Sequence, residues 1–226
     1  METTYQTTLP QHKYLTFLIM LYLTIMLCSA VLIYKPIEMK FGYASGATIT
    51  FPLWFVLSDL IAEVYGFKIS KKILWTGFFC QFIFSLLCFL LINIPSPPHW
   101  AEQHSFDLVL GHLLKITIVA FATIMISGYL NIYLITKWKI LLRGKYFWMR
   151  SCAASIIGEG IYSVIATSLL QYGMVPLSDI PIIIFWGYSF KICCTVFLAT
   201  PANLICRFLK KSEGIDIYEA STFYPF

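Results

Sequence analysis

Six long apolar stretches alternate with short polar segments along the chain. Each stretch is about 20 residues long, which is the length that an α-helix needs to cross the hydrocarbon core of a bilayer. The stretches cover residues 14–34, 47–65, 73–94, 113–135, 151–172 and 182–204. This pattern predicts an all-α polytopic membrane protein, a bundle of six transmembrane helices.

Lysine and arginine are distributed unevenly over the polar segments. Twelve of them lie in the N-terminal segment, the second and fourth loops and the C-terminal segment, whereas the other three loops contain only Lys35 and Lys40. Basic loops remain on the cytoplasmic side of a membrane. We therefore expect a cytoplasmic N-terminal segment (1–13), a six-span transmembrane domain (14–206) and a cytoplasmic C-terminal tail (207–226).

The composition excludes several classes of protein. With 59% hydrophobic and 12% charged residues among 226, the chain cannot cover a soluble domain with polar side chains. The formal charge of +5 is accounted for by the basic loops, so nucleic acid is not an expected partner. The sequence contains no zinc-binding spacing and no nucleophile motif. We expect neither enzyme activity nor a metal or cofactor.

Four charged residues lie well inside the apolar stretches, namely Asp59, Glu63, Glu159 and Lys191. A charge at this depth costs about 2.5–3.5 kcal/mol on insertion scales, so such residues usually face a protein interior or a polar cavity. Asp59 and Glu63 are four residues apart and share one helix face, and Glu159 lies on a stripe of serines at four-residue steps. We expect the four to meet in one cavity near the middle of the membrane, with Lys191 paired to one acid.

The second stretch contains Pro52, which fits best in the first turn of a helix. Two interpretations are open. The helix is either broken before Pro52, as in transporters whose discontinuous helices face a substrate, or continuous with a proline kink. We expect the preceding small and hydroxyl residues, 44–50, to re-enter the membrane.

The buried carboxylates suit a flat heterocycle that presents adjacent N–H groups, because two parallel hydrogen bonds would fix its orientation. Aromatic walls could come from four residues, Trp54, Tyr65, Tyr162 and Trp186. The full set of expected substrate-binding residues is Asp59, Glu63, Tyr65, Glu159, Lys191, Trp54, Tyr162, Tyr188 and Asn131.

Three short motifs follow one another along the chain. Phe51 and Pro52 lead to Asp-Leu-x-x-Glu-Val-Tyr-Gly at 59–66, residues 150–159 read Arg-Ser-x-x-x-Ser-x-x-Gly-Glu, and residues 188–191 read Tyr-x-Phe-Lys. In these motifs the sequence resembles the queuosine precursor transporter family. The resemblance implies uptake of 7-cyano- or 7-aminomethyl-7-deazaguanine across the bacterial inner membrane for tRNA modification.

The chain departs from this family at two places. Residues 160–162 contain no aspartate where many relatives have one, and Gly128 stands where a glutamine is common. The finished base queuine is therefore an alternative substrate. A different class of function is also open, the substrate-binding membrane subunit of an energy-coupling-factor vitamin importer, which would need separate ATPase subunits because this chain has no Walker motif. If the chain transports its substrate without ATPase subunits, a proton or sodium could be the coupling ion.

Overall fold

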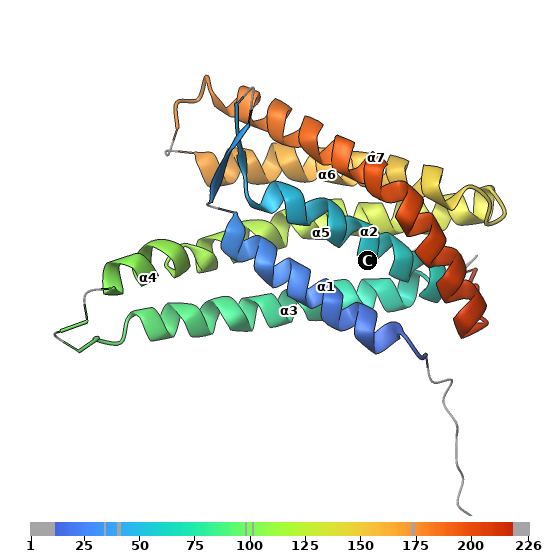
Figure 1. Ribbon diagram of the computed structural model, residues 1–226, viewed down its shortest axis with the longest axis horizontal. Helices are drawn as coiled ribbons and strands as arrows, with labels where there is room; N and C mark the ends of the chain where they lie inside the picture. Colours follow the sequence, from blue (N-terminus) through green and yellow to red (C-terminus); the bar gives the residue numbers. More distant parts are fainter. Residues whose placement is uncertain are drawn as a thin grey trace, which may run out of the picture.

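The computed structural model describes residues 12–33, 35–39, 42–97, 99–100, 102–172 and 175–218 (Figure 1). Of the predicted N-terminal segment 1–13 only residues 12 and 13 are described, and of the predicted C-terminal tail 207–226 only residues 207–218. The helices are α1 (Leu15–Leu32), α2 (Ala47–Tyr65), α3 (Phe67–Ile92), α4 (Gln103–Leu110), α5 (Leu113–Leu141), α6 (Phe147–Gln171) and α7 (Ile180–Glu213), and the strands are β1 (Pro36–Met39) and β2 (Gly42–Ser45). Six helical segments of the described chain are long and apolar enough to cross a membrane. The predicted all-α membrane bundle is confirmed.

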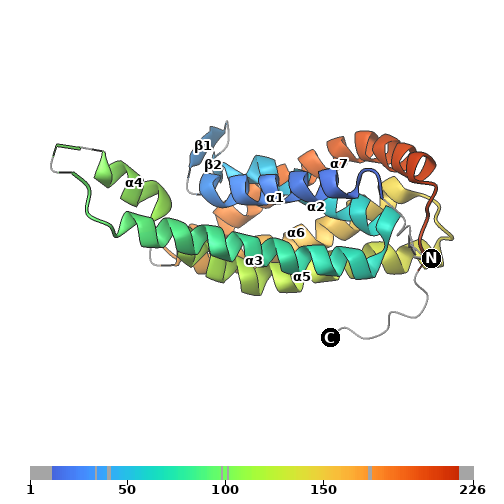
Figure 2. The same cartoon turned by 90° about the horizontal axis from the view of Figure 1, so that it is seen from below.

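Helix α2 lies at the centre of the bundle. Nearly all of its residues are buried, and it contacts each of the other five long helices. Figure 2 shows α3 and α5 side by side below α1 and α2. The outer faces of the peripheral helices carry large apolar side chains such as Phe79, Ile126 and Phe197, as expected where lipid replaces water as the solvent.

Gly66 joins α2 directly to α3. Its φ of 87° and ψ of 174° lie in a region of backbone conformation that is open essentially to glycine alone. The chain reverses there without a loop, so α3 begins at Phe67 rather than at the predicted residue 73. The glycine at the end of the Glu-Val-Tyr-Gly motif is therefore needed for the turn.

The segment before α2 differs from the prediction. The stretch expected to re-enter the membrane is divided between two elements: its first two residues end strand β2 and the residues from Ala47 onward begin α2. Strands β1 and β2 form an antiparallel hairpin in which Pro36 lies opposite Ser45. Helix α2 then runs unbroken from Ala47 past Pro52 to Tyr65. Of the two interpretations of this span, the discontinuous helix was wrong and the continuous helix is the one observed. Because Pro52 has no N–H, it cannot donate the usual helical hydrogen bond to the carbonyl group of Thr48.

Helix α7 extends well past its predicted end at residue 204. It ends at Glu213, where Gly214 has a positive φ of 68° and Lys210 and Lys211 occupy the last turn. Both features stabilise a helix C-terminus, since glycine adopts the left-handed conformation and the lysines complement the helix dipole. The third loop contains one further short helix, α4, that the sequence did not predict.

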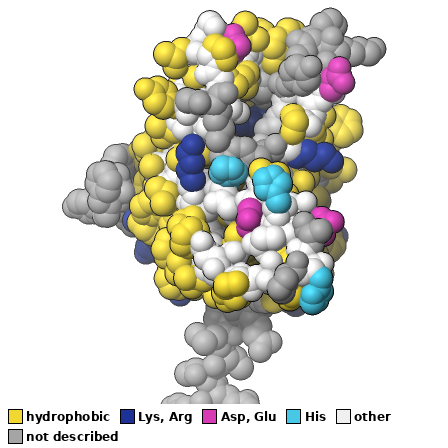
Figure 3. Space-filling view, turned by 90° about the vertical axis from the view of Figure 1, so that its left-hand side faces the viewer, with side chains coloured by type: hydrophobic (Ala, Val, Ile, Leu, Met, Phe, Trp, Pro, Cys, Tyr) yellow, Lys and Arg dark blue, Asp and Glu magenta, His cyan; other side chains and the backbone are white. Residues whose placement is uncertain are grey.

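The two described ends of the chain lie at the same end of the bundle. The backbone N–H groups of Lys13 and Tyr14 donate to the carboxylate of Glu213, at 3.0 and 2.7 Å. The basic first turns of α3 and the basic loop between α5 and α6 belong to this end, as the alternating helix directions require. We call it the basic end. The opposite end carries the hairpin and exposed histidine and acidic side chains (Figure 3), and we call it the hairpin end.

Candidate functional site

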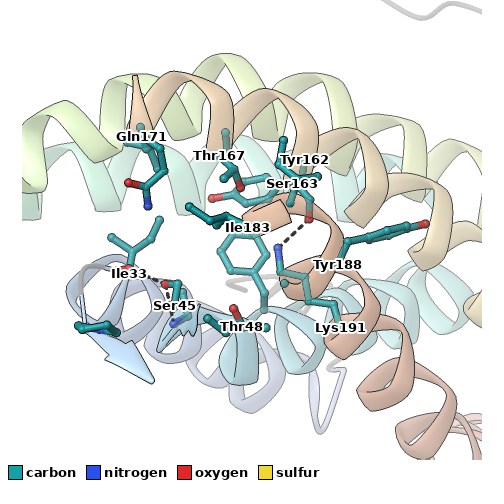
Figure 4. A pocket seen from close by; sticks show the side chains of 18 residues that line it. Ile33, Ser45, Thr48, Tyr162, Ser163, Thr167, Gln171, Ile183, Tyr188 and Lys191 are labelled. Carbon is teal, nitrogen blue, oxygen red and sulfur yellow. Dashed lines mark hydrogen bonds between the residues drawn. The ribbon is translucent and has the colours of Figure 1, made fainter. Parts of the chain in front are cut away.

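A cavity of about 270 Å³ lies between the hairpin and helices α2, α6 and α7 (Figure 4). Its aromatic walls are the rings of Phe51 and Tyr162, with Tyr188 beside them. Its polar wall is formed by Ser45, Thr48, Ser163, Thr167, Gln171, Tyr188 and Lys191. Since Thr48 is the residue whose carbonyl loses a helical partner to Pro52, the proline leaves a backbone acceptor beside the cavity.

Helix α6 supplies one polar stripe along its whole length. The predicted stripe of Ser151, Ser155, Glu159 and Ser163 continues at the same four-residue step through Thr167 and Gln171. Figure 4 shows Ser163, Thr167 and Gln171 on one face of α6, which lines the cavity. In the other half of the stripe, nearer the basic end, the serines face the buried carboxylate of Asp59.

Lys191 lies in the cavity wall, as the sequence predicted. Its ammonium group donates to the hydroxyl of Ser163 at 2.9 Å and lies 5.0 Å from the ring centroid of Phe51 and 5.1 Å from that of Tyr162. A cation at such distances is attracted to the ring faces. Only one of its three N–H groups is used by Ser163, so the others are available to an acceptor in the cavity.

Glu159 lies one helical turn from Ser163, behind the cavity wall rather than in it. Its Oε1 atom accepts a hydrogen bond from Thr195 at 3.1 Å, while its buried Oε2 atom has no hydrogen-bond partner among the described residues. The expected ion pair of Lys191 with one of the three acids is not found within 4.0 Å among the described residues, and Lys191 donates to Ser163 instead. An unsatisfied buried carboxylate oxygen is costly.

Asp59, one of the expected substrate-binding residues, does not line the cavity. Its carboxylate accepts hydrogen bonds from Asn131 and Ser151, both at 2.5 Å, and from Ser155 at 3.0 Å. These donors come from α5 and α6, so Asp59 connects α2 to both helices. Asn131 is likewise occupied by Asp59 and lies outside the cavity.

Glu63 is also placed differently from the expectation. Both of its carboxylate oxygens accept from the guanidinium of Arg150, at 2.7 and 2.9 Å, and Lys210 forms a further ion pair at 2.6 Å. Glu63 and Arg150 are both fully buried, and buried charges need such partners. The sequence analysis did not assign Arg150 a role, although its place at the start of the fifth span opposite an intramembrane acid was a usable signal.

A second group of charges continues from Glu63 to the basic end. Lys139 forms an ion pair with Asp216 at 2.5 Å and donates to the backbone carbonyls of Glu63 and Ile217. Lys210 pairs with Asp216 as well, at 2.9 Å. We call Glu63, Arg150, Lys139, Lys210 and Asp216 the ionic cluster. It holds the segment after α7 against α2 and α5.

The aromatic residues divide among three places. Tyr162 and Tyr188 line the cavity as predicted, and the Tyr188 hydroxyl donates to the carbonyl of Ile156 at 2.9 Å. Tyr65 lies at the basic end, where its hydroxyl donates to Glu213 at 2.7 Å. Trp54 lines a smaller second cavity, and Trp186 lines neither. Phe51, which the sequence analysis used only as a motif residue, is part of the cavity wall.

Metal binding has no support in the described residues. No group of three or more histidine, cysteine, aspartate or glutamate side chains among them is placed to hold a metal ion. The polar groups of the cavity are instead one ammonium, several hydroxyls and one amide.

The family model described as Putative vitamin uptake transporter matches residues 45–206. This stretch begins at the last residue of the hairpin and includes every helix that lines the cavity. The chain belongs to this family. Members are membrane transporters of small molecules, so the multi-pass bundle surrounds a small-molecule path and its outer face is in contact with lipid. No curated protein and no solved structure matches the chain.

Proposed function

We propose that this transporter imports a queuosine precursor, 7-cyano- or 7-aminomethyl-7-deazaguanine, across the bacterial inner membrane for tRNA modification, with queuine as an alternative substrate. The observation that carries the proposal is the ammonium group of Lys191, buried against two aromatic rings in a cavity at the end of the bundle that carries the hairpin. The motifs that resemble queuosine precursor transporters support the choice of substrate.

The size and walls of the cavity favour a small planar base. Its volume of about 270 Å³ is near the lower limit of ligand sites, which measure about 300–1,000 Å³. Phe51 and Tyr162 offer ring faces for stacking. Lys191 can donate to the carbonyl oxygen of a deazaguanine, and the hydroxyls of Thr48, Ser163 and Thr167 can serve its remaining polar atoms.

Glu159 is the acid that we assign to transport. Of the three intramembrane carboxylates considered in the sequence analysis, Asp59 and Glu63 are occupied by donors from neighbouring helices. Glu159 has one buried oxygen, one turn from the cavity, that accepts no hydrogen bond from the residues that the structure describes. Its proposed role is to accept an N–H of the substrate or to carry a coupling proton while the substrate moves inward.

The arrangement of the two ends supports alternating access. The cavity lies beside the hairpin, and the ionic cluster closes the basic end. Because twelve of the basic residues belong to that end, we assign it to the cytoplasm. Import would then require the ionic cluster to separate while the hairpin end closes over the substrate.

Uptake in cells that cannot make queuosine tests the proposal. We expect cells expressing the chain to accumulate labelled 7-cyano-7-deazaguanine and to restore queuosine in tRNA, and Lys191→Met to abolish both. Lys115→Met, which removes an exposed lysine near the start of α5, is the matched control and should transport normally. Accumulation of a vitamin but of no deazaguanine would overturn the proposal.

The family description keeps a second candidate open, a vitamin-binding subunit of an energy-coupling-factor importer. The same uptake experiment in a host without coupling subunits separates the two. Uptake there supports a self-sufficient transporter, and uptake that appears only when ATPase and coupling subunits are supplied supports the second candidate.

A further inference from the structure

A second, much smaller cavity lies directly behind the first. Its volume is about 20 Å³, enough for about one water-sized group, since a water needs about 10–15 Å³ measured in this way. Residues of α1, α2, α3, α5 and α6 line it, among them Met26, Trp54, Gln81 and Ile124. We call it the inner chamber.

The inner chamber and the main cavity share three wall residues, Ile33, Phe51 and Tyr162. The rings of Phe51 and Tyr162 are packed against each other with centroids 4.1 Å apart and planes inclined by 38°. These two rings, from α2 and α6, therefore form a partition between the two spaces. A group in the main cavity can reach the inner chamber when one of the rings turns aside.

Gln81 is the polar residue of α3 in the inner chamber wall. Its side chain is only 2% exposed, and its Oε1 atom accepts no hydrogen bond from the described residues. The neighbouring wall is largely apolar, with Met26, Ile116 and Ile124, and it includes Trp54, whose buried Nε1–H has no partner among the described residues. A buried amide oxygen in apolar surroundings needs a donor, and the inner chamber is the space from which a donor of one heavy atom could reach it.

We propose that the inner chamber is a subsite for an amine substituent of the planar heterocycle bound in the main cavity, with Gln81 Oε1 accepting its N–H. This inference rests on the proposed function. The aromatic partition of Phe51 and Tyr162 opens to admit the substituent, and Lys191, on the cavity side of the same two rings, holds the carbonyl of the base.

The chemistry of the subsite explains which bases it selects. A carbonyl substituent would place two acceptors against each other, and a methyl group would leave the amide oxygen of Gln81 unpaired. Only a donor of one heavy atom fits both the volume and the acceptor. A site that hydrogen-bonds a substrate N–H rejects analogues without it far more strongly than a merely apolar pocket rejects a change of size. Gln81 is thus a specificity residue for a 2-amino group.

Equilibrium binding to the purified chain in lipid nanodiscs tests the subsite. The probes are 7-cyano-7-deazaguanine and its 2-deamino analogue, together with guanine and hypoxanthine as a second matched pair. We expect the wild type to prefer the amine-bearing member of a pair by about tenfold or more. Gln81→Met keeps the side-chain volume but removes the acceptor and should reduce this preference to less than about threefold, while binding of the deamino analogue, which also reports correct folding, stays unchanged.

Two further variants make the experiment specific. Gln81→Glu retains an acceptor and should retain the preference for the amine. Ser85→Ala changes a buried residue one turn further along α3 that bonds to Thr117 and lines neither cavity, and it should behave as the wild type.

The outcomes separate the subsite from the transported substrate. If deazaguanine binds with an amine preference that Gln81→Met leaves intact, the subsite is wrong and the proposed function stands. If only the guanine and hypoxanthine pair binds, with a preference that depends on Gln81, the subsite stands and the proposed substrate is wrong. If neither pair binds, both are overturned.

Discussion

The guanidinium group of Arg150 donates to both carboxylate oxygens of Glu63, at 2.7 and 2.9 Å, with both side chains fully buried. This paired geometry is the strongest that the two groups can form. It explains how an acid at membrane depth is tolerated without a ligand. It also separates Glu63 from Glu159, the acid that retains an unpaired oxygen near the cavity.

Replacing Glu63 should therefore affect stability rather than recognition. Glu63→Gln leaves Arg150 and Lys210 without their buried counter-charge, and we expect a loss of about 3–5 kcal/mol in the free energy of unfolding, measured in detergent. Glu102→Gln, at an exposed position, should change it by about 0.5 kcal/mol or less. If the Glu63→Gln variant has full stability but no longer binds substrate, the prediction is wrong and Glu63 belongs to the binding site.

Glu159→Gln should instead affect transport and leave stability largely unchanged. The amide keeps the shape of the side chain and the contact with Thr195 but removes the charge. We expect the initial rate of deazaguanine uptake to fall at least about tenfold, with an unchanged amount of protein in the membrane. Glu38→Gln makes the same chemical change at an exposed hairpin position and should leave uptake intact.

Comparing binding with uptake defines the role of Glu159 further. A variant that binds substrate with normal affinity but does not accumulate it indicates a carboxylate that carries the coupling proton. A variant that no longer binds indicates direct contact with the substrate. Undiminished uptake would show that Glu159 has neither role.

Asp216 gives the ionic cluster a predictable dependence on pH. Partial burial by itself would raise the pKa of this carboxyl, but hydrogen bonds and charges from Lys139 and Lys210 outweigh burial and hold the pKa below its usual value. A depressed pKa in the folded state means that Asp216 stabilises the fold above its unfolded pKa of about 3.9, and that this contribution is lost as the pH falls through the lower folded value.

We therefore expect Asp216→Asn to destabilise the protein at pH 7 by a modest amount, about 1 kcal/mol or less, because the carboxyl is partly exposed. The difference between wild type and variant should shrink as the pH is lowered below about 4, in a series of thermal unfolding measurements in detergent. A difference that stays constant down to pH 3 would contradict the assigned ion pairs.

Gly66 should tolerate no side chain. In its backbone conformation a Cβ atom is strained, and Gly66→Ala should reduce the free energy of unfolding by about 1–3 kcal/mol. Gly187 is the matched control, since it lies within helix α7 with open space around the position of a Cβ atom, and Gly187→Ala should be neutral or stabilising by up to about 1 kcal/mol. Equal effects of the two changes would argue against the strained turn.

Much of the fold follows from local patterns. The six spans are visible in the sequence because each is a run of apolar residues of bilayer length. The stripe on α6 is visible because residues four apart share a helix face. The hairpin was missed although residues 37–41 alternate apolar and polar side chains, because the segment was interpreted as leading into a re-entrant stretch. The extension of α7 to Glu213 was missed because its last turns are polar.

The candidate site was predicted only in part. Lys191, Tyr162 and Tyr188 line the cavity, and each was found as a polar or aromatic residue in an apolar span. Asp59 and Glu63 have the same signal in the sequence but have structural partners instead. A buried charge is recognisable from its position in the chain, whereas its partner comes from another helix and depends on packing.

By itself, the sequence determined that this protein crosses the membrane six times and that several charged residues lie inside it, because length, hydropathy and helical period are properties of neighbouring residues. Only the tertiary structure decided which of those charges are neutralised. The packing of α2 against α5, α6 and α7 gives Asp59 and Glu63 their donors, and it places Lys191 in the cavity wall and Glu159 behind it. It likewise places Gln81 behind the aromatic partition, which no local pattern could indicate, because that contact joins residues from separate helices.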